Sequence, residues 1–72
     1  MTENERVKQV RKSLGLTLEE FAEPLGVGKT AISKIENGLS NVTQQMELSI
    51  CREYDINEAW LRTGEGEMKT EQ

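Results

Sequence analysis

The sequence has no histidine, one cysteine and one proline among its 72 residues. Without histidine it lacks the commonest metal ligand and the commonest general base at neutral pH. The lone Cys51 cannot form an internal disulfide, which fits a reducing compartment. The remaining residues show no nucleophile-and-base pair and no metal-ligand cluster. We therefore expect no enzyme, no metal site, no cofactor and no small-molecule ligand.

Long apolar runs are also missing. No stretch approaches the roughly 18 apolar residues of a membrane-spanning helix, and the first turns of the chain lack the apolar core of a signal peptide. We expect no membrane partner and a cytoplasmic location. A chain of 72 residues suits one small domain. Such a domain buries only about 60 % of the surface that its unfolded form exposes, so its stability will be modest.

The net charge of −4 is unevenly distributed along the chain. Residues 1–40 contain six basic and six acidic residues, whereas residues 41–72 contain three basic and seven acidic residues. A protein with a negative net charge is an unusual partner for nucleic acid. However, a ligand responds first to the local field, and the acidity belongs to the C-terminal half.

Apolar residues at helical spacing predict two helices in the first part of the chain. The first helix covers about residues 3–14, and Gly15 follows it in a left-handed conformation. Thr17 and Glu20 have the spacing of a capping box and open a second helix that Gly26 closes. Pro24 lies inside this second helix and has no N–H to donate to the carbonyl of residue 20. We therefore predict that the last turn of the second helix is kinked or frayed.

Three more helices follow. A four-residue break at 26–29 precedes a third helix that ends at residues 37–38, and two short helices around a glycine turn outline a helix-turn-helix. Thr43 can cap a fourth helix over about 44–54. Asn57 can cap a last helix in which Trp60 and Leu61 face inward. No segment alternates apolar and polar residues, so no strand is expected.

Segment 17–38, above all AISKIENG at 31–38, resembles the helix-turn-helix of the XRE (Cro/CI-type) transcriptional regulators. The similarity continues through ICREYDINEAWLRTGEGEM at 50–68 to small phage or prophage members, and covers about residues 6–68. The resemblance implies an all-α, five-helix, lambda-repressor-like DNA-binding domain at 1–64, with the helix-turn-helix in helices 2 and 3. Residues 65–72 would then form a flexible polar tail.

The resemblance also implies how the chain binds its partner. It would bind double-stranded DNA at an inverted-repeat operator as a homodimer, in a bacterium or encoded by a phage in a bacterial host, with its third helix in the major groove. Repression is the expected role. The positions that match base-reading residues are Lys29, Thr30, Ser33 and Lys34. Those that match or suit contacts with the DNA backbone are Thr17, Gly28 and Asn37.

Two further pairs come from the same resemblance. Arg11 and Glu36 match a buried ion pair that ties the first helix to the third. Trp60 and Leu61 lie in a corner that contributes to the dimer contact in the family, although Trp60 is first of all expected to fill the core. The acidic side chains expected to point away from DNA are Glu47, Glu53, Asp55 and Glu58.

Each of these interpretations has a plainer alternative. Exposed lysines are usually solvated, and only the surrounding pattern favours a DNA role for Lys29 and Lys34. Arg6 and Lys12 either reach phosphates or are simply solvated. Cys51 is expected to fill a small buried slot.

The sequence departs from the family at two places that bear on DNA affinity. Leu18 stands where many members carry a glutamine that anchors the second helix to a phosphate, and residues 39–45 contain no basic side chain. Each missing phosphate contact flattens the log–log salt dependence of binding by roughly 0.9. The alternative function is therefore a protein-interaction module on the same fold, such as an antirepressor or a mixed-dimer partner, with weak DNA affinity.

Overall fold

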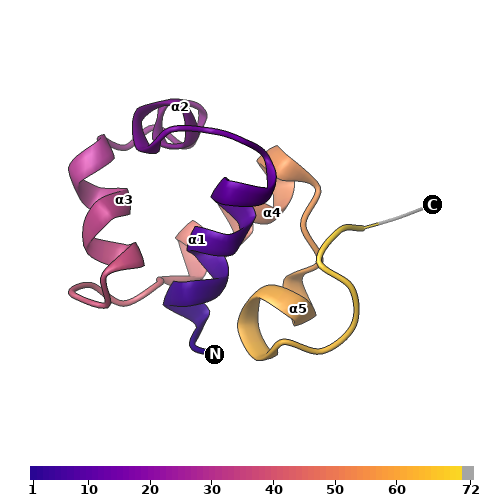
Figure 1. Ribbon diagram of the computed structural model, residues 1–72. Coiled ribbons are helices and arrows are strands. Elements are labelled where there is room, and N and C mark those ends of the chain that lie inside the picture. The colour runs from indigo at the N-terminus through magenta and orange to yellow at the C-terminus, as the bar shows by residue number, and fades with distance from the viewer. Residues whose placement is uncertain (71–72) are drawn as a thin grey trace.

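Residues 1–70 form five α-helices, with one short 3₁₀ helix between the second and the third (Figure 1). A computed structural model describes residues 1–70. The elements are α1 (Glu3–Ser13), α2 (Leu18–Ala22), η1 (Glu23–Leu25), α3 (Lys29–Glu36), α4 (Gln44–Tyr54) and α5 (Glu58–Thr63). Residues 1–70 contain no β-strand, only an isolated bridge between Ile56 and Lys69. The predicted all-α, five-helix fold is confirmed.

The predicted helix starts are confirmed at atomic detail. The Thr17 hydroxyl accepts a hydrogen bond from the Glu20 amide at 3.1 Å, and the Glu20 carboxylate accepts one from the Thr17 amide at 2.9 Å. The Thr43 hydroxyl caps α4 by accepting a hydrogen bond from the Met46 amide, and the Asn57 side chain caps α5 by accepting one from the Ala59 amide. These bonds satisfy backbone donors that the helix itself leaves open.

The second helix changes its winding near Pro24, as predicted. Its α-helical part stops at Ala22, and residues 23–25 continue as the 3₁₀ helix η1. Because Pro24 has no N–H, it cannot continue the α-helical hydrogen-bond ladder. Gly26 then adopts φ +77°, a left-handed conformation that suits glycine, and turns the chain toward α3.

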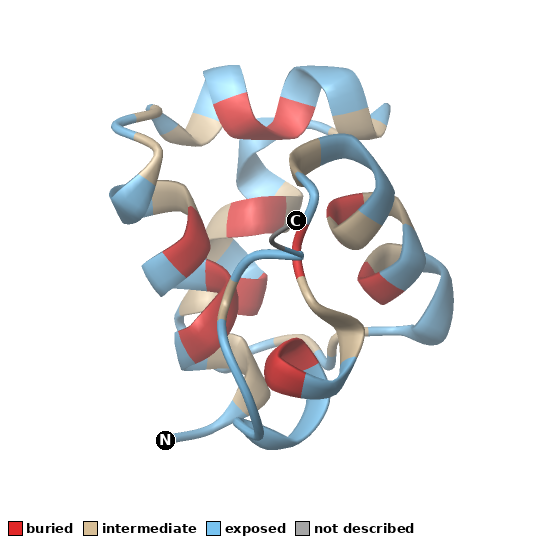
Figure 2. Cartoon of the chain, turned by 90° about the vertical axis from the view of Figure 1, so that its right-hand side faces the viewer, coloured by how far each residue is buried: buried red, intermediate tan, exposed pale blue. Residues whose placement is uncertain are grey.

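The core lies where the inward faces of the helices meet (Figure 2). Its most buried aromatic residue, Phe21, stacks on Tyr54 with ring centroids 4.8 Å apart and planes at 7°. The Tyr54 hydroxyl also donates a hydrogen bond to the Phe21 carbonyl at 2.8 Å. This contact fastens the end of α4 to α2. The buried hydrophobic residues are Val7, Val10, Phe21, Ala22, Ile32, Ile35, Ile50, Ile56, Trp60 and Leu61.

Arg6 was expected either to be solvated or to reach a phosphate, and the structure shows that it does neither. The residue is only 6 % exposed. Its guanidinium donates to the carbonyls of Leu61 and Arg62, both at 2.7 Å, and to that of Met1 at 2.9 Å. A cation next to the last carbonyls of a helix is also favoured by the helix dipole. Arg6 therefore fastens the C-terminal end of α5 to α1.

The segment after α5 folds back and forms hydrogen bonds with the residues between α4 and α5. The Asn57 amide donates to the Met68 carbonyl at 2.8 Å, and the Thr70 amide donates to the Asp55 carbonyl at 2.9 Å. The Met68 side chain packs against the core. Residues 68–70 are thus bonded to residues 55–57, whereas the sequence predicted a free tail from residue 65. None of the helices within residues 1–70 has the length and apolar character needed to cross a membrane.

Candidate nucleic-acid interface

The connection between α2 and α3 leaves the start of α3 open to solvent. The Val27 amide donates to the Ala22 carbonyl at 3.3 Å, which holds the turn against α2. Gly28 is the N-cap of α3, is exposed, and supplies no side-chain cap. The first N–H groups of α3 therefore keep the geometry with which helix starts bind anions.

The four predicted base-reading residues lie on one side of α3. Lys29, Thr30 and Lys34 are exposed and Ser33 is half-buried. Their positions differ by one, three, four or five residues, so they lie on one side of the helix. The buried residues Ile32 and Ile35 occupy the opposite side and pack into the core. α3 thus presents a continuous polar face that no other element of residues 1–70 covers.

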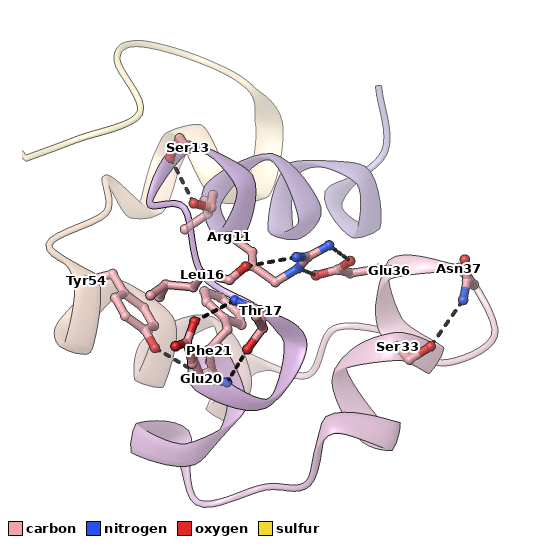
Figure 3. Close-up of polar contacts among 11 residues, drawn as sticks. Arg11, Ser13, Leu16, Thr17, Glu20, Phe21, Ser33, Glu36, Asn37 and Tyr54 are labelled. Atoms are coloured by element: carbon pink, nitrogen blue, oxygen red, sulfur yellow. Dashed lines mark hydrogen bonds and ion pairs between the residues drawn. The ribbon is translucent and has the colours of Figure 1, made fainter.

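Asn37, predicted to contact the DNA backbone, lies next to this face. Its side-chain amide donates a hydrogen bond to the Ser33 hydroxyl at 3.3 Å (Figure 3). Asn37 is exposed and is the C-cap of α3. Thr17 is exposed at the start of α2, with its hydroxyl already accepting the Glu20 amide. The predicted backbone contacts Thr17, Gly28 and Asn37 therefore all lie at ends of the two helices.

The expected ion pair between Arg11 and Glu36 is present. Nε and Nη2 of Arg11 donate to the two Glu36 carboxylate oxygens at 2.8 and 3.0 Å (Figure 3). Nη1 of Arg11 donates to the Leu16 carbonyl at 2.9 Å. The hydrogen bonds to Glu36 raise the pKa of Arg11 further. One guanidinium thus joins α1, the segment before α2 and the C-terminal end of α3.

Asn4 makes two long-range hydrogen bonds that the sequence did not predict. Its side-chain amide donates to the carbonyls of Ile35 at 2.8 Å and Ser40 at 2.7 Å. Both partners are more than thirty residues away in the chain. An asparagine in the first turn of a helix is ordinary, so no local pattern points to this role.

Glu47 was expected only to point away from DNA, and its burial, at 7 % exposure, is a feature that the sequence did not predict. Nε of Arg62 donates to its Oε1 at 2.9 Å, and Arg62 also pairs with Glu58. Burial and the hydrogen bond with Glu47 raise the pKa of Glu3 to about 7, whereas the bonds from Glu3 and Arg62 lower the pKa of Glu47. Oε2 of Glu3 is buried without a donor to bind. When the Glu3 carboxyl is protonated, its O–H group donates a hydrogen bond to the Glu47 carboxylate, and this bond helps to raise the pKa of Glu3.

The surface beside α3 carries negative charge. Glu19, Glu20 and Glu23 line a groove together with Gly28 and Lys29. Leu18 packs partly against the core and offers no polar group. Residues 39–45 contain no basic side chain, as the sequence shows. The positive charge of the candidate interface therefore rests mainly on Lys29 and Lys34.

The dimer-contact candidates are largely enclosed. Leu61 has no exposed surface, so its side chain cannot touch a partner subunit, and this expectation was wrong. Trp60 is 9 % exposed and packs in the core, as first expected.

Cys51 is half-buried, and burial raises the pKa of its thiol to about 11. The thiol is thus protonated at neutral pH, which makes it a poor nucleophile.

Comparison with known proteins gives matches over most of the chain. The model of a family described as "Helix-turn-helix domain" matches residues 4–67. Antitoxin PezA of Streptococcus pneumoniae serotype 4 (strain ATCC BAA-334 / TIGR4) is 33 % identical over 51 residues. The matched region is 71 % of this chain but only 32 % of the antitoxin, so the chain spans about a third of that protein.

Two solved structures share the fold. The P22 c2 repressor, in complex with synthetic operator 9T in the presence of Tl⁺, superposes with a TM-score of 0.80 at 22 % identity, over 90 % of this chain and 98 % of that one. SinR, a master regulator for biofilm formation in complex with DNA, superposes with a TM-score of 0.75 at 34 % identity, over 83 % of this chain and 97 % of that one.

These likenesses agree with the arrangement of α2 and α3 described above. The matched family comprises helix-turn-helix domains and not enzymes, and the lambda-repressor-like fold is common to this chain and both solved structures. The match extends over 64 of the 72 residues, counting from 4 to 67. The chain therefore belongs to the XRE-type helix-turn-helix domain family.

Proposed function

We propose that the chain is a transcriptional repressor that binds an inverted-repeat operator in double-stranded DNA as a homodimer, with α3 in the major groove. The observation that carries the proposal is the uncovered polar face of α3. Lys29, Thr30 and Lys34 are exposed there, while the core and the Arg11–Glu36 pair hold the opposite side of the helix. A helix held in this way can enter the groove without rearrangement.

Each site residue has a role that suits its chemistry. The lysines find the two acceptors of guanine, whereas Thr30 and Ser33 donate or accept with little base preference. Each half-site therefore contains at least one guanine, and the half-sites lie about one helical turn, roughly 34 Å, apart. The residues assigned to the DNA backbone are Thr17, Gly28 and Asn37.

The relatives support a DNA-binding role for this chain. SinR, 34 % identical, was solved in complex with DNA, and the more distant P22 c2 repressor was solved with an operator. We assign the chain to the bacterial cytoplasm, in a host or phage setting. We place the DNA-binding domain at residues 1–64, and residues 68–70 fold back on it through hydrogen bonds to residues 55–57 and the packing of Met68 against the core. Trp60, which is 9 % exposed, remains the candidate dimer contact on α5.

Random-site selection on the whole chain, followed by fluorescence anisotropy across a salt series, tests this proposal. We expect tight binding to the selected duplex and little binding to a scrambled one. Lys34→Ala is expected to weaken binding by about tenfold and to flatten the log–log salt slope by about 0.9. Lys8→Ala is the control, because Lys8 is an exposed lysine of α1 without an assigned role. Equal effects of the two variants would contradict the assignment of α3.

The acidic groove favours a second candidate function. Glu19, Glu20 and Glu23 lie beside Lys29 and would repel phosphates. A protein-interaction module with this fold, an antirepressor or mixed-dimer partner, would not need a positive surface. The matched relative is by name an antitoxin, so a protein similar to this chain has a named role other than that of a repressor. A selection that enriches no duplex at low salt, together with mixed dimers formed with a second regulator of this family, would favour this candidate.

A further inference from the structure

Asn4 connects the first turn of α1 to the end of α3 and to the loop that follows, residues 37–43. We propose that Asn4 is a positioning residue for DNA binding, which holds this post-α3 loop in the conformation that the DNA backbone meets. The inference rests on the proposed function and extends it to a residue outside α2 and α3. Figure 1 shows the loop running from α3 past the N-terminal turn of α1.

The geometry uses both hydrogens of one amide group. Nδ2 of Asn4 lies 2.8 Å from the Ile35 carbonyl and 2.7 Å from the Ser40 carbonyl. Ile35 belongs to the last turn of α3, and Ser40 lies in the middle of the loop. Both bonds are partly buried, so water competes with them less than at an open surface.

The other anchor of the loop is the carbonyl of a predicted base-reading residue. The amides of Leu39 and Ser40 donate to the Lys34 carbonyl at 2.8 and 3.3 Å. The loop is thus attached to α3 through Lys34 and to α1 through Asn4. A shift of the loop would disturb the backbone of Lys34 and the nearby Asn37.

The composition of the loop makes its position important. Residues 37–43 lack the long basic side chains that reach phosphates over a range of distances. Contacts from this region must therefore come from backbone N–H groups and short polar side chains. Such hydrogen bonds weaken steeply with poor distance or angle. A loop that is already ordered also avoids an ordering cost on binding.

Asparagine is chemically required at this position if the inference holds. In Asn4→Asp, carboxylate oxygens would replace the donor and face two carbonyl oxygens. The same change would otherwise be favourable, because an acidic residue in the first turn of a helix interacts well with its dipole. A loss caused by Asn4→Asp would therefore come from the two carbonyl contacts and not from α1 itself.

The first test is independent of DNA. Amide hydrogen exchange is measured in Asn4→Asp and in Gln9→Glu, an exposed position of the same helix that makes the same amide-to-carboxylate change. We expect exchange of the Leu39 and Ser40 amides to rise about tenfold in Asn4→Asp, while amides in the middle of α1 keep their wild-type rates. Equal exchange of the loop amides in both variants would overturn the proposal.

The second test uses Asn4→Ala and Gln9→Ala with the duplex from random-site selection. We expect Asn4→Ala to weaken binding about tenfold with an unchanged salt slope, since no phosphate contact of its own is lost. If Asn4→Ala flattened the salt slope of DNA binding as Lys34→Ala does, Asn4 would contact the DNA directly. If Asn4→Ala left the DNA affinity unchanged, Asn4 would have no role in binding. Either result would overturn the proposal. If the wild-type chain selects no duplex, the proposed function fails, and with it the positioning role. The exchange result then shows separately whether Asn4 holds the loop.

Discussion

Arg11 and Glu36 form an ion pair with two hydrogen bonds, of 2.8 and 3.0 Å, between α1 and the last turn of α3. Their side chains are 15 % and 5 % exposed, so the pair is largely removed from water. Because Arg11 also binds the Leu16 carbonyl, the pair sets the position of α3 relative to both α1 and the start of α2. The orientation of the polar face of α3 depends on this contact.

A double-mutant cycle of Arg11→Met and Glu36→Leu measures the contribution of this pair. Arg11→Met leaves a buried carboxylate without its partner, which costs roughly 3 kcal/mol of unfolding free energy. The double variant should lose less than the two single variants together, with a coupling energy of roughly 2 kcal/mol from urea unfolding. A coupling energy near zero would show that the pair contributes nothing specific.

Arg6 is expected to matter more for stability than Lys8, an exposed basic residue of the same helix. Arg6→Met would remove the donor to the carbonyls of Leu61, Arg62 and Met1, two of which lie at the end of α5. Unpaired, partly buried carbonyls cost roughly 3 kcal/mol in total. Lys8→Met, at an exposed position of the same helix, serves as the control in urea unfolding. Equal midpoints for the two variants would contradict the role assigned to Arg6.

The pair Glu3–Glu47 makes stability depend on pH. The pKa of Glu3 is raised from 4.5 to about 7 by burial, then by the hydrogen bond and charge of Glu47, while Arg6 and Arg62 oppose the shift. Between these two values the folded chain binds more protons at Glu3 than the unfolded chain does. The contribution of this proton to stability is therefore complete below pH 4.5 and is lost as the pH rises through about 7. The lowered pKa of Glu47 acts in the opposite sense, and only at acid pH.

Thermal unfolding of the wild type and of Glu3→Gln checks this pH dependence. The glutamine amide keeps the shape and the donor of the protonated carboxyl without titrating. We expect the wild-type Tm to fall, relative to that of Glu3→Gln, as the pH rises from about 5.5 to about 8. A constant difference in Tm over this range would show that Glu3 does not titrate there.

Tyr54→Phe separates the hydrogen bond of Tyr54 from its ring contact. The change removes the donor to the Phe21 carbonyl at 2.8 Å and leaves the stacked rings in place. We expect a loss of about 1 kcal/mol in unfolding free energy, measured by urea denaturation. A loss of 3 kcal/mol or more would mean instead that the ring itself moves.

Several features could be predicted from the sequence because they are local. The helix starts at Thr17, Thr43 and Asn57 need only a side chain and an amide two or three residues away. The change of winding at Pro24 follows from the chemistry of one residue. Arg11 and Glu36 were matched through the family pattern, which stands in for knowledge of the fold.

Other features were decided only by the tertiary structure. Arg6 was expected either to reach a phosphate or to be solvated, Glu47 was expected only to point away from DNA, and Asn4 had no assigned role. The partners of these three residues lie far away in the chain. Arg6 binds Leu61, 55 residues on, and Asn4 binds Ile35, 31 residues on. A polar side chain in a short helix is compatible with solvent or with a buried contact, and its own neighbours do not distinguish them. The distinction arises only when packing brings unpaired carbonyls or charges to the same place, where leaving them unbonded costs free energy.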